Sequence, residues 1–218
     1  MHQSKSLASA ALAFLFFIHF GKAFASDAMQ NHCEGIFSAK AEKSFSEGEL
    51  TPKDIWSPNG QFSIKATTKT ISMQKNGEQD FPLNVLVNPA LMEVVWNNNS
   101  QGFAINLSDG GLVGTWEPKL FTIGPGDVPV EVDLRAILDQ ASKKYLRCSP
   151  EEEANWGVLT WLRGDILVAA EVPPHSSCKN MGQFFGFRVS LKSKKVIEVF
   201  SEKTLRTKWK EVLECRFY

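Results

Sequence analysis

Apolar and polar residues alternate along much of this chain, in short runs separated by turn-forming residues. The pattern is clearest in residues 156–201, where four such runs follow one another. They cover residues 157–162, 166–172, 184–191 and 196–200, and the segments between them contain glycine, two consecutive prolines or clustered lysines. Alternation with a period of two, bounded by Gly, Pro and charged residues, is typical of antiparallel strands joined by turns. These residues are predicted to form a four-stranded antiparallel sheet.

Two earlier parts of the chain repeat this arrangement. Trp56 and Trp96 lie 40 residues apart, and each ends an apolar run that precedes a turn and a second strand. Trp161 has the same position in the last repeat, so all three tryptophans are expected to be buried at equivalent points. Repeats of this length with four strands each are typical of β-propeller blades. The chain is predicted to be mainly β, with antiparallel blade-like four-stranded units over about 53–90, 91–132 and 155–201.

Residues 55–64, Ile-Trp-Ser-Pro-Asn-Gly-Gln-Phe-Ser-Ile, carry a resemblance to a known family. They resemble the Trp-Ser-Pro-Asp-Gly strand-turn-strand of TolB-like and WD-type β-propeller repeats, with Asn59 where those repeats usually have Asp. The segments that begin at Trp96 and Trp161 are weaker copies. The resemblance implies a partial propeller or stacked sheets. Because a ring needs at least four blades, three units leave an open stack, a sandwich or closure by another chain.

Two helices are expected beside the strands. Residues 133–147 place apolar side chains at intervals of three and four, with Asp133 suited to the start and lysines to the end. This helix is inserted between the second and third units. A second, C-terminal helix is expected over 202–214, with Ser201 as its N-cap.

The first 25 residues resemble a secretory signal peptide. Lys5 precedes an apolar stretch over 7–20, and Ala23-Phe24-Ala25 fits a cleavage site before Ser26. The apolar stretch is short for a membrane span, so no stable span is expected after cleavage. The mature protein is predicted to be periplasmic or secreted, with residues 26–218 forming a single β-rich domain.

The charge balance limits the expected partners. Removing residues 1–25 leaves 22 basic and 24 acidic residues. A nearly neutral surface gives no long-range attraction for nucleic acid or anionic lipid. We therefore expect a protein or an envelope component as the partner, and no nucleic acid. No ligand spacing typical of a metal site and no cofactor motif occurs, so we expect neither a metal nor a cofactor.

Four cysteines, Cys33, Cys148, Cys178 and Cys215, remain after export into an oxidising compartment. An even number there favours disulfide bonds, and three pairings are possible. We favour Cys148–Cys178, which would link the inserted helix to the third unit, and Cys33–Cys215, which would link the two ends.

Two loops are candidate binding elements because both are longer than a hairpin requires. One covers 108–116 and carries Asp109 and Trp116. The other covers 173–183 and carries His175, Lys179 and Asn180. Long loops on a rigid sheet scaffold often bind ligands, so the two loops are expected to line one concave surface.

Three functions are compatible with these patterns. The first, implied by the family resemblance, is a non-enzymatic exported module that binds a protein or envelope component. The second is a small secreted hydrolase that uses the 173–182 loop, because His175 could act as a base beside a nucleophile at Ser176, Ser177 or Cys178. The third is a purely structural domain stabilised by disulfides. No nucleophile-elbow pattern accompanies the histidine, so no catalytic residue is assigned.

Overall fold

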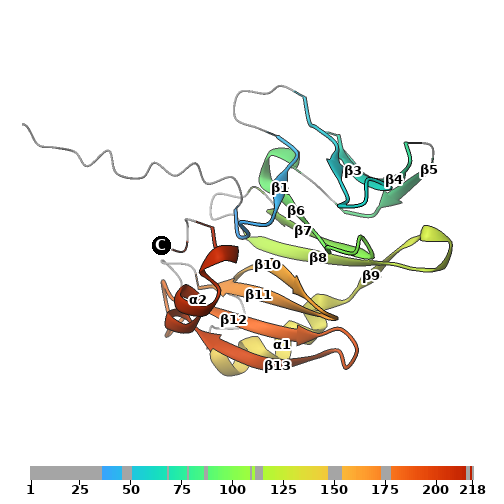
Figure 1. Cartoon of the computed structure of the whole chain (residues 1–218). Helices are drawn as coiled ribbons and strands as arrows, with labels where there is room; N and C mark the ends of the chain where they lie inside the picture. The colour runs from blue at the N-terminus through green and yellow to red at the C-terminus, as the bar shows by residue number, and fades with distance from the viewer. Residues whose placement is uncertain are drawn as a thin grey trace, which may run out of the picture. The chain divides into compact units, whose positions relative to one another are not determined.

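Three antiparallel β-sheets form the body of the protein in the computed structural model (Figure 1). The structure describes residues 36–45, 51–67, 69–77, 79–85, 88–108, 110, 115–146, 154–172, 178–214 and 217. Within these residues, the strands of each sheet are nearly all consecutive in sequence and pair antiparallel. The predicted fold class is confirmed: the chain is mainly β, with one inserted and one C-terminal helix, and the sheets are stacked without closing into a ring.

The first sheet consists of β2 (Ile55–Trp56), β3 (Phe62–Ala66), β4 (Ile71–Lys75) and β5 (Gln79–Leu83). The second contains β6 (Met92–Trp96), β7 (Gly102–Ser108), β8 (Trp116–Ile123) and β9 (Pro129–Val132), and β1 (Glu42–Lys43) pairs with the edge of β6. The third contains β10 (Asn155–Leu162), β11 (Asp165–Glu171), β12 (Phe184–Ser190) and β13 (Lys195–Ser201). The helices are α1 (Leu134–Tyr145) and α2 (Glu202–Lys208), with short 3-10 turns η1 (Pro89–Leu91), η2 (Pro125–Asp127) and η3 (Lys210–Val212).

The turn between β2 and β3 follows from the Ser-Pro-Asn-Gly sequence. Gly60 has a φ of 70°, a conformation that glycine adopts without steric cost. The Ser57 hydroxyl lies 2.9 Å from Asn59 Oδ1 and accepts a hydrogen bond of 3.0 Å from the Phe62 N–H. These bonds hold the turn and set the register of the first hairpin.

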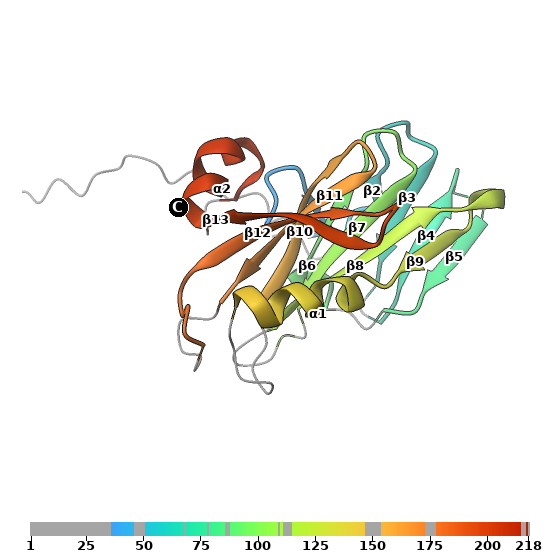
Figure 2. The same cartoon turned by 90° about the horizontal axis from the view of Figure 1, so that it is seen from below.

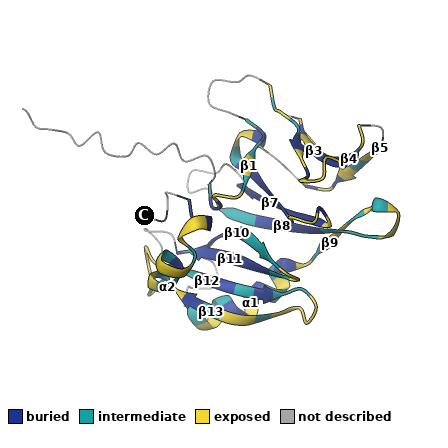
Figure 3. Ribbon diagram, viewed as in Figure 1, coloured by how far each residue is buried: buried dark blue, intermediate teal, exposed yellow. Residues whose placement is uncertain are grey.

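The first and second sheets pack face to face over one apolar core. Alternate residues of strands β3 to β8 point into it, as period-two alternation requires. Its fully buried members include Phe62, Ile64, Met73, Met92, Phe103 and Ile105. The second sheet is also covered on its other face, so all residues of β6 and β7 are buried (Figure 3).

The second and third sheets share another core, which α1 also covers (Figure 2). Trp161 of β10 connects the two sheets, because its indole Nε1 donates a 3.0 Å hydrogen bond to the carbonyl of Val95. Its ring lies against Gly102, where a Cβ would come within 2.8 Å of the indole. A bulge between Val158 and Thr160 shifts the register of β10, so that Val158 and Trp161 contact the same core.

The far face of the third sheet is covered by α2 and the segment after it. Leu205 of α2 packs on Gly186, where a Cβ would lie 2.5 Å from Leu205 Cδ2. The helix predicted over 202–214 is shorter than expected, since the chain leaves α-helical geometry at Trp209 and continues as η3. Ser201 is its N-cap, as predicted. Among the described residues, no helix combines the length and apolar character that crossing a membrane requires.

The other face of the first sheet carries no covering layer among the described residues. Its strands present polar or exposed residues there, including Lys65, Gln74 and Asp80. Trp56 is on this side of β2 and is 47% exposed, so the expectation that all three tryptophans are buried is wrong. Trp96 points toward the first sheet, and Trp161 points toward the second. The first sheet has no preceding sheet that could cover Trp56.

Residues 36–43 run across the edges of the second and third sheets. β1 pairs with β6, and Ser38 forms a β-bridge with Leu213. Phe37 is fully buried against Gly157, where a Cβ would lie 2.2 Å from the Phe37 ring. This segment connects the second sheet, the third sheet and the C-terminal residues.

Candidate functional site

The predicted binding residue Trp116 begins β8 and is half-buried. Its ring contacts Phe37 edge-on, with the centroids 5.7 Å apart, and it packs against the core on the α2 side of the third sheet. The backbone N–H of Trp116 donates to Asn155 Oδ1 at 3.1 Å, and the Asn155 side-chain amide donates to Glu171 at 3.2 Å. The starts of β8 and β10 and the end of β11 are therefore linked at one end of the sheets.

The other described binding candidates lie in the turn before β12. Asn180 donates a 2.8 Å hydrogen bond to the carbonyl of Tyr145, the last residue of α1. Its amide is therefore engaged in holding the helix end. Lys179 is exposed. Asp109 and His175 lie outside the described residues, so the shared concave surface and the hydrolase loop stay predictions.

Cys178 is buried in the core between the second and third sheets and is not a free thiol. The remaining cysteines, Cys33, Cys148 and Cys215, lie outside the described residues. The pairings Cys148–Cys178 and Cys33–Cys215 stay predictions.

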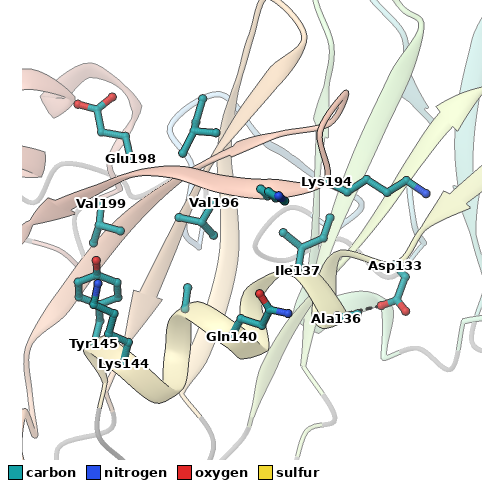
Figure 4. Close-up of a pocket in the computed structure, with 13 residues that line it drawn as sticks. Asp133, Ala136, Ile137, Gln140, Lys144, Tyr145, Lys194, Val196, Glu198 and Val199 are labelled. Atoms are coloured by element: carbon teal, nitrogen blue, oxygen red, sulfur yellow. Dashed lines mark hydrogen bonds between the residues drawn. The ribbon is translucent and has the colours of Figure 1, made fainter.

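An open groove of about 650 Å³ lies between α1 and β13, and we call it the α1–β13 groove (Figure 4). β13 is the edge strand of the third sheet, and no described strand pairs with its outer side. The groove is lined from the helix by Asp133, Ala136, Ile137, Gln140, Ala141, Lys144 and Tyr145, and from the strand side by residues 194–199.

Apolar side chains form the inner part of this groove. Ile137 and Gln140 of α1 and Val196 of β13 project into the space between helix and strand, whereas Glu198 points away from the helix (Figure 4). Ile197 is the extra residue at a bulge in β13 and is 52% exposed. An exposed edge strand beside an apolar floor can accept an extended peptide.

The local sequence holds both walls of the groove in place. Asp133 caps α1 by accepting a 3.0 Å hydrogen bond from the Ala136 N–H, and the negative charge suits the helix N-terminus. Leu134 and Leu138 on the opposite side of α1 are buried against the sheets. Lys194 has a φ of 51° in the tight turn that leads into β13. Both walls are therefore rigid elements of the fold.

Glu93 is the most buried ionisable group that the structure describes, with none of its surface exposed. Its carboxylate accepts hydrogen bonds from the backbone N–H groups of Ile36, Phe37 and Ser38, and from the side-chain amide of Asn106. Burial raises the pKa of Glu93, although the four hydrogen bonds lower it. Because these donors use the carboxylate and no solvent reaches it, its role is to position the chain.

Sequence reasoning did not single out Glu93, Asn106 or the α1–β13 groove. A signal for the first two was present, since each is a polar residue inside an otherwise apolar run. Such a residue on a strand buried on both faces must find hydrogen-bond partners. The groove depends on how α1 packs beside β13, which no local pattern reports.

Comparison with protein-family models, with curated proteins and with solved structures finds no match to this chain. The described residues also contain no group of three or more His, Cys, Asp or Glu side chains arranged to hold a metal ion.

Proposed function

We propose that this protein is an exported, non-enzymatic interaction module that holds an acidic segment of a partner protein in the α1–β13 groove. The observation that carries the proposal is an open groove beside an edge strand, lined by lysines that no described acidic side chain pairs with. The signal-like residues 1–25 and the resemblance to TolB-like repeats support export and an interaction role.

The charges in the groove favour an acidic occupant. Lys144, Lys194 and Lys195 form no ion pair with any described residue, and Lys144 lies 5.0 Å from the ring centroid of Tyr145. Asp133 caps the helix, and Glu198 points away from the helix and lies 3.9 Å from a guanidinium nitrogen of Arg188, which pairs more closely with Asp165 at 2.7 Å. Three lysines against two acids leave the groove with a surplus of one positive charge, which complements a negatively charged segment.

The shape of the groove favours an extended segment with some apolar side chains. The outer edge of β13 offers backbone groups for pairing, and Ile137, Val196 and Val199 offer apolar contacts. Lysines on an edge strand also oppose pairing with a second copy of the same edge. The same lysines thus reject a like strand and attract an acidic one.

Selection from a displayed library of random 12-residue peptides tests this proposal with the full mature chain as bait. We expect enrichment of peptides that combine acidic and apolar residues. Replacing Lys144, Lys194 and Lys195 together by Glu should weaken their binding by about tenfold or more, since each charge pair contributes up to ~1 kcal/mol.

The matched control replaces three exposed lysines of the first unit by Glu, and it should leave peptide binding unchanged. These lysines are Lys53, Lys65 and Lys69. Enrichment of basic or purely apolar peptides would contradict the proposal. The proposal would also be contradicted if acidic peptides bound both triple variants equally, or if the selection yielded no peptide.

A further inference from the structure

A second, smaller groove lies where the first strands of all three sheets come together. Its volume is about 330 Å³, and it is distinct from the α1–β13 groove. It is lined by Lys40 and Glu42 near β1, Trp56 and Pro58 at β2, Val94, Trp96 and Asn98 at β6, and Thr160 of β10. We call it the inner-edge groove. Because three sheets and β1 contribute to it, its lining is fixed by the packing of the whole stack.

An exposed indole is the main apolar surface of the inner-edge groove. Trp56 is 47% exposed even though it belongs to a paired strand and is held opposite Ser63. Large aromatic side chains normally bury most of their surface. A flat aromatic face on a rigid strand is suited to stacking against a flat ligand face.

Several polar side chains around this indole have no partner among the described residues. The side chains of Lys40, Asn98 and Thr160 line the groove and make no hydrogen bond with a described residue. The indole N–H of Trp96 is enclosed in the core, so only the ring of that residue contributes to the lining. Ammonium, amide and hydroxyl groups around an exposed indole can form hydrogen bonds with a ligand that carries hydroxyl groups.

The balance of charge narrows the class of ligand. Lys40 and Glu42 give the groove one positive and one negative side chain, so it has no surplus charge for a phosphate or a metal ion. Amide, hydroxyl, ammonium and carboxylate groups together supply donors and acceptors. A neutral ligand with many hydroxyl groups and a flat apolar face meets all of these conditions.

We propose that the inner-edge groove binds a neutral saccharide, with one sugar ring stacked on Trp56. In this arrangement Lys40 and Asn98 donate to sugar oxygens, and Glu42 accepts from a sugar hydroxyl. The volume is at the lower end of the range of roughly 300–1,000 Å³ for ligand pockets, which suits a ligand of one or two rings. The proposal does not depend on the α1–β13 groove.

An array of neutral and charged oligosaccharides, probed with the full mature chain and followed by calorimetric titration of the soluble sugars that bind, tests this inference. We expect a set of neutral glycans to bind. Trp56→Ala should weaken binding by about tenfold or more, because it removes the stacking surface, and Glu42→Ala should weaken it by about fivefold through the lost hydrogen bond.

Trp209→Phe is the control, because Trp209 lies at the core beside α2 and does not line this groove. It should leave binding unchanged. The inference would be overturned if no neutral glycan bound or if only charged glycans bound. Equal binding by the wild type and Trp56→Ala would also overturn it. Far-ultraviolet circular dichroism of the three variants confirms that each is folded.

Discussion

Asn106 faces Glu93 across β6 and β7 and donates a hydrogen bond of 2.7 Å to its carboxylate. The same amide group also binds the third sheet, since it accepts from the Val158 N–H at 2.7 Å and donates to the Val158 carbonyl at 2.9 Å. β10 is an edge strand, so its outward backbone groups need such partners. Glu93 and Asn106 together join the second sheet, the third sheet and residues 36–38.

Replacing Glu93 by Gln should destabilise the fold. The substitution keeps the size of the side chain, but its amide NH₂ would face N–H groups that now donate to the carboxylate. We expect a loss of about 1–3 kcal/mol in the free energy of unfolding, measured by urea denaturation. Glu198→Gln, at an exposed position, is the control and should leave the transition unchanged. Equal stability of Glu93→Gln and the wild type would contradict the account of this network.

The pH dependence of stability should carry the signature of Glu93. Burial raises the pKa of this carboxyl above its ordinary value of 4.5, so the folded state binds a proton more readily than the unfolded state. The unfolding free energy of the wild type, relative to Glu93→Gln, should be greatest below 4.5 and should fall as the pH rises through the raised pKa. Urea unfolding of both proteins at a series of pH values measures this difference. A relative stability that increases with pH would show that the pKa is lowered instead.

Gly157→Ala should be destabilising because Phe37 occupies the space that a Cβ requires. We expect a cost of about 1–3 kcal/mol from overpacking, seen as a lower melting temperature. Gly124→Ala, where the nearest side-chain atom lies 3.1 Å from the added Cβ, should cost less. Adding Phe37→Leu to Gly157→Ala should restore part of the loss, and no restoration would mean that Phe37 is not the obstacle.

The tryptophans of the three sheets should differ in their effects on stability. Trp161→Ala removes a ring that packs on Gly102 and a hydrogen bond to Val95, and should cost about 3–5 kcal/mol. Trp56→Ala should be mild, because nearly half of that side chain is exposed. Chemical denaturation of both variants compares them directly. A large loss for Trp56→Ala and a small one for Trp161→Ala would contradict the stacking order of the sheets.

Much of the fold follows from local patterns in the sequence. Alternating residues and the Ser-Pro-Asn-Gly turn predict the hairpins, and Asp133 and Ser201 cap the two helices as expected. The exposure of Trp56 could not be derived in this way. Its strand has the same local pattern as β6, and what differs is the neighbouring sheet. Burial on a sheet face is a property of the stack, which a single repeat does not contain.

The candidate site was less accessible to sequence reasoning than the fold. Loop length drew attention to Trp116 and Asn180, yet Trp116 packs against Phe37 and Asn180 holds the end of α1. The lysines of the α1–β13 groove come from segments about fifty residues apart, so no spacing links Lys144 to Lys194. Only the packing of α1 beside the edge strand brings them into one groove.

Site-specific photo-crosslinking in the organism that produces the protein tests the interaction role most directly. A crosslinking amino acid at Gln140, whose side chain projects into the α1–β13 groove, is compared with one at Lys65 on the uncovered face of the first sheet. Mass spectrometry then identifies the segment joined to each position. The account predicts one discrete protein adduct at Gln140, through an acidic segment, that is absent at Lys65 and lost when Lys144, Lys194 and Lys195 are reversed. No adduct at Gln140, or the same adducts at both positions, would contradict it.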